Sequence, residues 1–214
     1  MVKLAICTPS TGMCRTAYAY SLARMVMYIA MNRLLPEVPE QEVRLFILEG
    51  SGISANREAM VEDALKADAT HILFLDEDMG FDPDVAHTLF ARRQQIVGCN
   101  YPMRVPPPQF TALAMDTTHR VYTGPDSTGL EPAFYIGFGC ALIERQVFEK
   151  IERPRFLIGY NTETHRYSTE DHPFCRKARD AGFVVYVDHD ASKKIFHVGN
   201  KNYRWDEVTH GNLA

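Results

Sequence analysis

The sequence predicts an α/β fold in which a mostly parallel central sheet is flanked by helices. The first observation is an uninterrupted apolar run at residues 72–75, directly before three acids. A strand without polar alternation suits a sheet that is covered on both faces. The second observation is that strand-like and helix-like segments alternate over the first hundred residues, which is typical of parallel strands joined by helices.

The first hundred residues can be assigned in order. Apolar side chains at helical spacing predict a helix over residues 15–35. Ser54 is expected to cap the helix before the central strand. Asp82 and Pro83 are expected to start the helix after that strand, which should reach about Arg93. Strands are expected at residues 2–8, 43–48, 71–75 and 96–99.

The second half contains fewer long elements. Residues 102–129 are rich in turn formers and predict loops and short strands. A strand-like run at residues 134–143 contains glycines, which permit close backbone approach. Residues 169–173 open a helix that Gly182 ends. A short helix is expected at residues 145–151, and strands at residues 183–187 and 195–199.

Composition limits the class of protein. With 214 residues and 46% hydrophobic side chains, residues 1–214 can form one domain with a sizeable core. No run approaches the ~20 apolar residues of a membrane span, and no signal-type segment opens the chain. The five cysteines are scattered and odd in number, so we expect reduced thiols and a cytoplasmic protein. A net charge of -4 excludes a global basic field that would attract nucleic acid, although a local basic patch stays open.

Asp76, Glu77 and Asp78 follow the central strand and are the main candidates for a functional site. Ligands of such sheets lie beyond the carboxyl ends of the strands. Adjacent carboxylates repel one another, and a divalent cation or hydrogen-bond donors would offset this repulsion. If the chain is extended here, Asp76 and Asp78 project to one side and can share a metal, while Glu77 projects to the other. The alternative is that the acids merely end a strand.

Four further residues are candidates for a functional role, and a purely structural explanation is possible for each of them. Arg57 lies near a helix start, where a cation opposes the helix dipole, so an anionic ligand or a surface salt bridge is expected to hold it. Glu170 and Asp171 open a helix, where acids usually complement the dipole. His197 follows an apolar run, where a histidine is more often structural than a ligand.

Taken together, these segments resemble the nucleotide-sugar-dependent glycosyltransferases of the GT-A fold, particularly small single-domain members from bacteria and phages. The resemblance extends over residues 2–199. The motifs that carry it are Thr8-Pro9, Arg57 in SANREAMVEDAL, the DXD-like Leu75-Asp76-Glu77-Asp78, Gly137 to Ile143, Glu170-Asp171, and His197-Val198-Gly199.

The resemblance implies a metal-dependent transfer of a sugar from a nucleotide donor, expected to be a UDP-sugar, to an acceptor hydroxyl. Residues 1–100 would bind the nucleotide sugar and residues 101–214 the acceptor. The implied metal ligands, for Mn²⁺ or Mg²⁺, are Asp78, Asp76 and His197. The implied donor-binding residues are Thr8, Pro9, Arg57, Asp76 and Glu77. The implied acceptor-side carboxylates are Asp171, as the catalytic base, and Glu170.

One departure from the family pattern leaves the base of the nucleotide open. Such enzymes commonly place an Asp at the end of the second strand, where this chain has Glu49. Two other functions stay open. A nucleotidyltransferase would normally show a glycine-rich, basic loop near the first strand, whereas residues 9–15 contain one glycine and one arginine. A non-catalytic module for nucleotides or carbohydrates would bind the donor without turnover.

The acceptor is also open. Phage enzymes of this general kind include some that glycosylate hydroxymethylated pyrimidines in DNA, in which case the protein would act in the host cytoplasm. Saccharide, lipid-linked and protein acceptors are the alternatives, and the oligomeric state is not indicated. Residues that could border a nucleic-acid groove are Tyr101, Arg104, Arg120, Arg145, Arg153 and Arg155.

Overall fold

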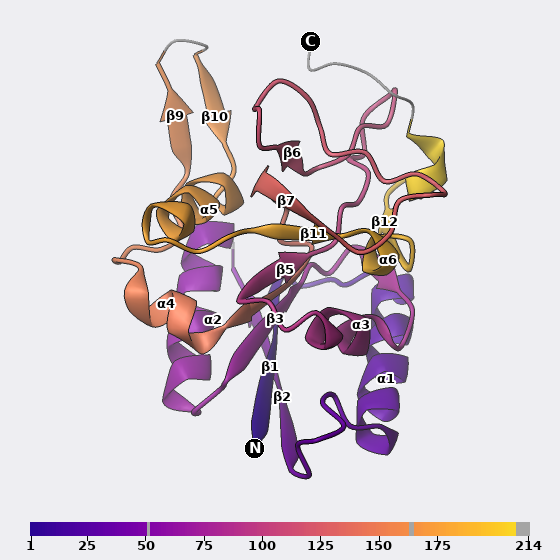
Figure 1. Ribbon diagram of the computed structural model, residues 1–214, viewed down its shortest axis with the longest axis vertical. Coiled ribbons are helices and arrows are strands. Elements are labelled where there is room, and N and C mark those ends of the chain that lie inside the picture. Colours follow the sequence, from indigo (N-terminus) through magenta and orange to yellow (C-terminus); the bar gives the residue numbers. More distant parts are fainter. Residues whose placement is uncertain (51, 163–164, 209–214) are drawn as a thin grey trace.

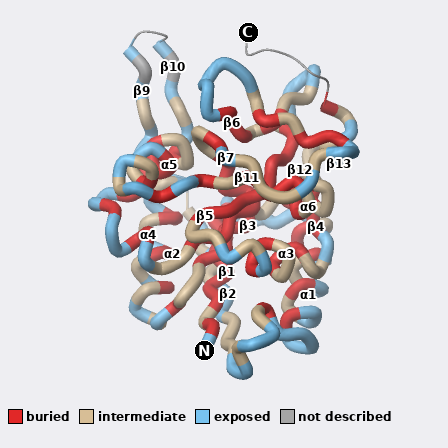
Figure 2. Tube along the Cα trace, viewed as in Figure 1, coloured by how far each residue is buried: buried red, intermediate tan, exposed pale blue. Residues whose placement is uncertain are grey.

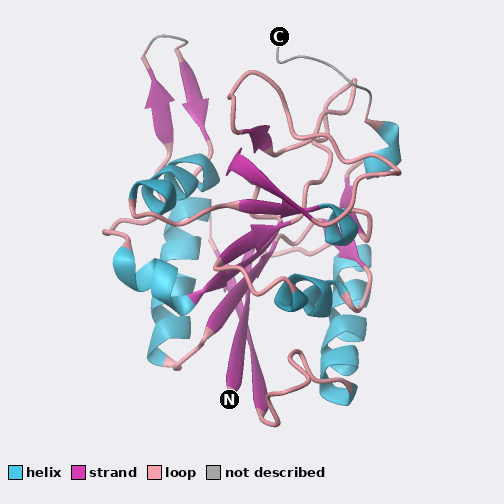
Figure 3. Ribbon diagram, viewed as in Figure 1, coloured by secondary structure: helices cyan, strands magenta, loops and turns pink. Residues whose placement is uncertain are grey.

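The computed structural model describes residues 1–50, 52–162 and 165–208. A large central sheet lies between two sets of helices, as Figures 1 and 3 show. The sheet order is β2 (Gln41–Glu49), β1 (Val2–Ser10), β3 (His71–Leu75), β8 (Cys140–Glu144), β5 (Ile96–Gly98), β11 (Tyr186–Asp188), β7 (Leu130–Tyr135) and β6 (Leu113–Ala114). The predicted α/β class is confirmed.

Most strands of this sheet point the same way. β1 is parallel to β2 and β3, and β11 is parallel to β5. β8 is inserted between β3 and β5 and is antiparallel to both, while β7 is antiparallel to β11. The sheet is therefore mostly parallel with two reversed strands, and strands of the two halves of the chain alternate within it.

The two faces of the sheet are covered by different helices. One face carries α1 (Thr16–Met31), α3 (Val85–Ala91) and α6 (His189–Ser192), and the other carries α2 (Ile53–Lys66), α4 (Arg145–Lys150) and α5 (Asp171–Asp180) (Figure 1). Successive residues of β1 pack into two hydrophobic cores, one on each face of the sheet. Ile6 packs in the cluster that includes Met25 of α1, and Cys7 packs in the cluster that includes Met60 of α2. The buried residues concentrate along the central strands (Figure 2).

Two small antiparallel units lie outside the large sheet. In the first, β12 (Ile195–Val198) pairs with β13 (Asn202–Tyr203) and with β4 (Met79–Phe81), the strand that directly follows the three acids. A short 3-10 helix, Trp205–Glu207, comes next. The second is a hairpin of β9 (Gly159–Asn161) and β10 (Arg166–Ser168), which projects beyond α5 (Figure 1).

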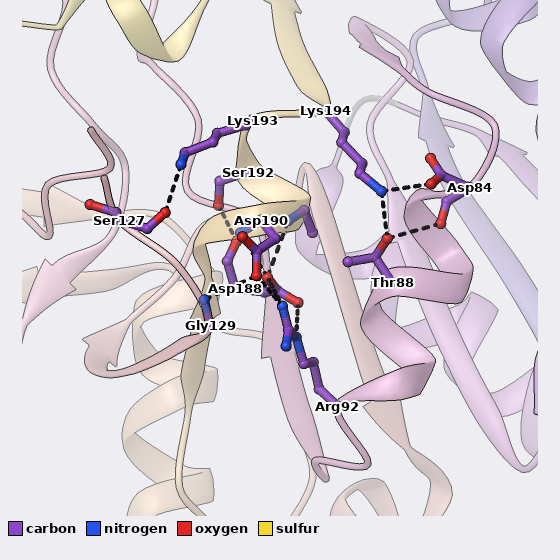
Figure 4. A network of polar contacts seen from close by, with 11 residues as sticks. Asp84, Thr88, Arg92, Ser127, Gly129, Asp188, Asp190, Ser192, Lys193 and Lys194 are labelled. Atoms are coloured by element: carbon purple, nitrogen blue, oxygen red, sulfur yellow. Dashed lines mark hydrogen bonds and ion pairs between the residues drawn. The ribbon is translucent and has the colours of Figure 1, made fainter. Parts of the chain in front are cut away.

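A polar network fixes the segment that leads into β12 (Figure 4). Asp188 accepts hydrogen bonds from the backbone N–H groups of Asp190 and Ala191 and thereby caps α6. The guanidinium of Arg92, the C-cap residue of α3, donates to both carboxylate oxygens of Asp188, at 2.7 and 3.2 Å. Lys194 reaches back to Asp84, at 2.6 Å. The chain therefore enters β12 from an anchored position.

Two expected helix caps are wrong. Gly52 occupies the N-cap of α2, and the Ser54 hydroxyl is buried without a partner among the described residues. Asp84 occupies the N-cap of α3, which begins at Val85 and ends at Ala91, because Asp82 takes part in a turn through its carbonyl. The helix expected over residues 15–35 ends at Met31.

The strand-like run at residues 134–143 divides into the end of β7, a turn and β8. Its glycines do permit a close approach, by the buried side chain of Tyr101. A Cβ atom would lie 2.5 Å from the Tyr101 hydroxyl at Gly137 and 2.6 Å at Gly139. The Gly139 N–H donates to this hydroxyl at 2.9 Å. The tight turn is possible because neither residue carries a side chain.

The five cysteines are free, and all except Cys14 are buried. Within the described ranges, no helix has both the length and the apolar character of a membrane span.

Candidate functional site

The three acids lie in a turn at the carboxyl end of β3. The strand ends at Leu75, and the Met79 N–H donates to the Asp76 carbonyl at 3.0 Å. The extended chain on which the expected one-sided projection of Asp76 and Asp78 was based is therefore absent, because a turn takes its place. Instead, each of the three carboxylates finds a different partner.

Asp76 and Glu170 are brought together by Arg57. Nη2 of Arg57 donates to Oδ1 of Asp76 at 2.8 Å, and Nε donates to Oε1 of Glu170 at 2.8 Å. The two carboxylates come from the β3 turn and from the start of α5, and the arginine is the fifth residue of α2. One guanidinium thus connects three elements that are distant in sequence.

Arg57 is not a surface residue. Only 1% of it is exposed, and its guanidinium carbon lies 5.0 Å from the ring centre of Phe74 and 5.7 Å from that of Phe138. Burial opposes its charge, but Asp76 and Glu170 outweigh this effect and raise the pKa of Arg57. The surface salt bridge is therefore excluded. The anions that hold Arg57 in this structure are two carboxylates of the protein.

Asp78 and His197 meet because β4 pairs with β12. In this pairing His197 lies opposite Met79, and the Val198 N–H donates to the Asp78 carbonyl at 2.8 Å. The distance between Nε2 of His197 and Oδ2 of Asp78 is 3.3 Å. Two side chains 119 residues apart in sequence thus form one polar pair.

The orientation of the His197 ring is fixed by its contacts with Pro102 and Tyr101. Its Nδ1 lies 2.9 Å from the carbonyl oxygen of Pro102, which only accepts, so Nδ1 carries a proton. The Tyr101 ring packs edge-on against the imidazole, with ring centres 5.5 Å apart. When the imidazole is neutral, its Nε2 lone pair faces the negative Asp78 carboxylate. A cation or a proton between the two groups would offset their mutual repulsion.

This pair fits a divalent cation. Two ligands bound to Mg²⁺ or Mn²⁺ at right angles lie about 3 Å apart. The Asp78 to His197 distance matches this separation, and the Pro102 carbonyl supplies the second hydrogen bond that metal-bound histidines usually make. Over the part of the chain that the structure describes, no three His, Cys, Asp or Glu residues form a cluster suited to a metal. Asp76 is paired with Arg57 instead. Asp78 and His197 would therefore leave most coordination positions of a bound ion to substrate and water.

Arg104 also contacts this pair. Its Nη1 lies 2.9 Å from Oδ2 of Asp78, and its side chain is 42% exposed. Burial opposes ionisation of Asp78, but His197 and Arg104 together lower the pKa of this carboxyl group. Asp78 is therefore an anion at neutral pH, with positive charge already beside it.

Glu77 organises the loop that follows β1. Its carboxylate accepts hydrogen bonds from the hydroxyl groups of Ser10 and Thr11, both at 2.6 Å. These bonds outweigh partial burial and lower the pKa of Glu77. Thr8 and Pro9 are buried at the end of β1, where the Thr8 hydroxyl contacts Tyr18. Direct contact of Thr8, Pro9 and Glu77 with a donor stays a prediction.

Asp171 is half-buried at the first position of α5, next to the buried Glu170. Its Oδ1 accepts hydrogen bonds from the Thr169 hydroxyl and from the His172 N–H, the latter at 2.8 Å. Burial is the main cause that raises the pKa of Asp171 to about 6, and the neighbouring Glu170 charge adds to it. The helix dipole would lower this pKa, but the loss of hydration outweighs it.

Sequence reasoning missed two contributors to this site. Arg104 and Tyr101 appeared only as candidates for a nucleic-acid groove, although one contacts Asp78 and the other supports His197. Two of the six residues expected to border that groove, Tyr101 and Arg155, are buried. Three of the remaining arginines are ion-paired: Arg104 with Asp78, Arg145 with Glu149, and Arg153 with Glu62.

Comparison with known proteins identifies the fold. The sequence matches no protein-family model and no curated protein sequence. The structure is similar to the viral protein A197 from STIV, with a TM-score of 0.60 and 20% identity over 93% of this chain and 86% of that one. It is also similar to the catalytic domain of Drosophila beta1,4galactosyltransferase 7 in complex with xylobiose, with a TM-score of 0.51 and 15% identity over 94% of this chain and 72% of that one.

A mutant of the same Drosophila enzyme, in complex with manganese, UDP-Gal and xylobiose, gives a TM-score of 0.51 and 13% identity over the same shares of the two chains. At such low sequence identity, the structural similarity shows a shared fold only. The central sheet with helices on both faces is the GT-A arrangement of these glycosyltransferase domains.

Proposed function

We propose that this protein is a metal-dependent glycosyltransferase, which moves a sugar from a nucleoside diphosphate to an acceptor hydroxyl. The observation that carries the proposal is the Asp78 and His197 pair, 3.3 Å apart at the carboxyl end of the sheet and adjacent to the Asp76, Arg57 and Glu170 group. Its GT-A fold, shared with a domain that was crystallised with manganese and UDP-Gal, supports the same assignment.

Asp78 and His197 would hold Mn²⁺ or Mg²⁺ together with oxygens of the donor diphosphate. When bound, the cation would neutralise the charge that develops on the departing nucleoside diphosphate. Asp78 suits this role because it is ionised, and His197 suits it because Nδ1 is already bound to Pro102. Arg104, which is partly exposed beside Asp78, would add a second positive charge near the diphosphate.

Arg57 would act mainly by positioning the site. It holds Asp76 and Glu170 in place, so that Asp76 can contact the donor sugar or ribose without electrostatic repulsion from Glu170. Burial raises the pKa of Asp76 in spite of the arginine, so this carboxyl group depends on Arg57 for its charge. A direct contact of Arg57 with the diphosphate remains a separate prediction.

Asp171 would accept the proton of the acceptor hydroxyl. In the proposed step, the hydroxyl oxygen bonds to the anomeric carbon, the bond from that carbon to the diphosphate oxygen breaks, and the proton passes to Asp171. A pKa of about 6 leaves this carboxylate ionised at neutral pH and makes it a stronger base than an ordinary Asp. With inversion of the sugar, Asp171 is the base; with retention, it would orient the acceptor instead.

The test is calorimetric titration of Mn²⁺ in the presence of UDP, followed by an assay for hydrolysis of UDP-sugars. We expect Asp78→Ala to abolish metal-dependent UDP binding, because His197 alone does not hold a hard cation against water. His197→Ala should weaken binding strongly. Asp76→Ala should have a smaller effect, since Asp76 is paired with Arg57.

A matched control is available in Asp116 and His119, an exposed Asp and His pair whose side chains lie 3.0 Å apart. Alanine at either position should leave Mn²⁺ and UDP binding unchanged. Unchanged binding in Asp78→Ala would remove the metal assignment and most of the case for a glycosyltransferase. Binding without hydrolysis or transfer would identify a binding module instead.

A further inference from the structure

We propose that the outer edge of the central sheet is a dimer interface, at which β2 pairs with the β2 of a second copy of this chain. β2 is the outermost strand of the large sheet, and among the described residues it pairs with β1 alone. Its nine residues, Gln41–Glu49, face β1 in unbroken register. The other side of β2 therefore offers backbone N–H and C=O groups to which another strand can bond.

This edge lacks the features with which proteins usually block an open strand. Residues 41–49 contain no proline, glycine or lysine, and the pairing with β1 has no bulge. Three of the side chains are charged. Glu42 and Arg44 form an ion pair with each other, and Glu49 is the last residue of the strand. The charges in the middle of the strand thus compensate each other, and they do not prevent the approach of a second strand.

One face of β2 carries exposed apolar side chains. Leu45 and Ile47 are 48% and 58% exposed. They lie on the same face of the sheet as Val43, which packs against the core that includes Met25 of α1. Further along the strand, α1 no longer covers this face. Two large apolar residues that are exposed next to an open strand edge indicate a surface that another protein chain covers.

The side of α1 that faces β2 is also apolar and carries short side chains. The opposite side is marked by Tyr28, whose ring packs against His87 of α3, with ring centres 4.9 Å apart. Since α3 lies over the middle of the sheet, the other side of α1 faces β2. Helical spacing places Val26, Ala23 and Ala30 there, and both alanines are exposed. Their small size leaves room for the side chains of a second copy beside α1.

The second copy is the partner that fits, because β2 is complementary to itself. A two-fold axis brings the same surface of both copies together. In an antiparallel pair centred on Leu45, Leu45 lies opposite Leu45 of the second copy, and Val43 lies opposite its Ile47. All of these side chains lie on the α1 face and form an apolar row across the interface. Over residues 41–49, this register places no two charged residues directly opposite each other. The inference does not depend on the proposed function.

The experiment measures the mass in solution by sedimentation equilibrium over a range of chain concentrations, and the hydrogen exchange of the β2 amides by mass spectrometry. The proteins are the wild type, Leu45→Lys, Leu45→Glu, Ile47→Lys and the control Val184→Lys. Val184 is an apolar residue of matched exposure, 46%, directly before β11, which four strands separate from β2. Circular dichroism checks that each variant is folded, and three separate substitutions allow for the loss of any one.

We expect the wild type to have twice the mass of one chain at micromolar concentration, with slower exchange of the β2 amides in the dimer than in the monomer. Each substitution in β2 should weaken the dimer about a hundredfold or more, because the two-fold axis places the new charge in the interface twice. The slow exchange of β2 should be lost with the dimer. Val184→Lys should dimerise as the wild type does.

A mixture of two variants tests the register of the pair. Leu45→Lys and Leu45→Glu, mixed in equal amounts, should associate more tightly than either variant alone, since opposite charges then face each other across the axis. The inference would be overturned by a mixture that associates no more tightly than its components, or by a dimer that the folded β2 variants leave intact. A wild type that stays monomeric would also overturn it, and would leave this edge to a different protein.

Discussion

The Asp171 carboxyl group is held by two donors on the same oxygen, the Thr169 hydroxyl and the His172 N–H. The second oxygen accepts neither of these bonds and is available to take a proton. An amide at this position can accept the same two bonds but cannot accept a proton under reaction conditions. Asp171→Asn therefore tests the chemistry of this residue while it preserves the local structure.

We predict that Asp171→Asn keeps Mn²⁺ and UDP binding but lowers the transfer rate by orders of magnitude, because the proton of the acceptor has no base. In the wild type, kcat/KM should fall about tenfold per pH unit below pH 6, since Asp171 is then protonated. Steady-state transfer kinetics across pH would check both points. Normal turnover of Asp171→Asn would move the role of base elsewhere, and Glu170→Gln would then be the next variant.

The same residue predicts an effect on stability with a definite sign. The pKa of Asp171 is about 6 in the folded protein, above the ordinary value of 3.8. The folded state therefore binds the proton more tightly, and the free energy of unfolding should decrease as pH rises from about 4 to 6. Asp171→Asn should unfold at higher urea concentration than the wild type above pH 6, and this difference should disappear below about pH 4. Equal stability of the two proteins at pH 8 would contradict the raised pKa.

At the scale of elements, Arg57 joins α2 to the turn after β3 and to the start of α5. Removing the guanidinium would leave Asp76 and Glu170 buried near each other without a counter-charge. We predict that Arg57→Met lowers the free energy of unfolding by ~3–5 kcal/mol, and that Glu170→Gln in the same chain restores part of this loss. Urea denaturation would measure both changes.

Arg153 provides the matched control for Arg57. It also pairs with a carboxylate of α2, Glu62, but its side chain is 62% exposed. Arg153→Met should cost about 1 kcal/mol or less. If Arg57→Met were as stable as Arg153→Met, while the KM for the donor increased, Arg57 would contact the diphosphate rather than support the site.

The elements that the sequence predicted best are those with a local signal. The β3 strand was recognised from four apolar residues, and α5 from its opening acids and from Gly182 after it. The pairing of β8 between β3 and β5 could not be predicted, because a five-residue strand does not encode which edges it joins. The contact between Arg57 and Glu170 joins residues that are 113 positions apart in sequence, so no local sequence pattern predicts it. The partners of the three acids were missed for a different reason, since a turn replaced the expected extended chain.

At the scale of the whole molecule, the two halves of the chain are interleaved. β8 belongs to residues 101–214 but lies between β3 and β5, and Phe148 and Phe174 of the second half pack in the same core as Met60 and Phe74 of the first. The proposed site has the same character, since Asp78 comes from the first half and His197 from the second. Donor binding should therefore require the complete sheet.

We predict that the full chain unfolds in one transition, and that a fragment of residues 1–100 does not fold cooperatively on its own. Without β8, both β3 and β5 would lose a paired edge, and the core around Phe74 would lose Phe148 and Phe174. Urea denaturation of the full chain, followed both by far-UV circular dichroism and by fluorescence of Trp205 in the second half, should give coincident curves. The fragment should show no sigmoidal transition by circular dichroism. A separate transition in the fragment, or an earlier loss of Trp205 fluorescence in the full chain, would instead indicate two units that fold independently.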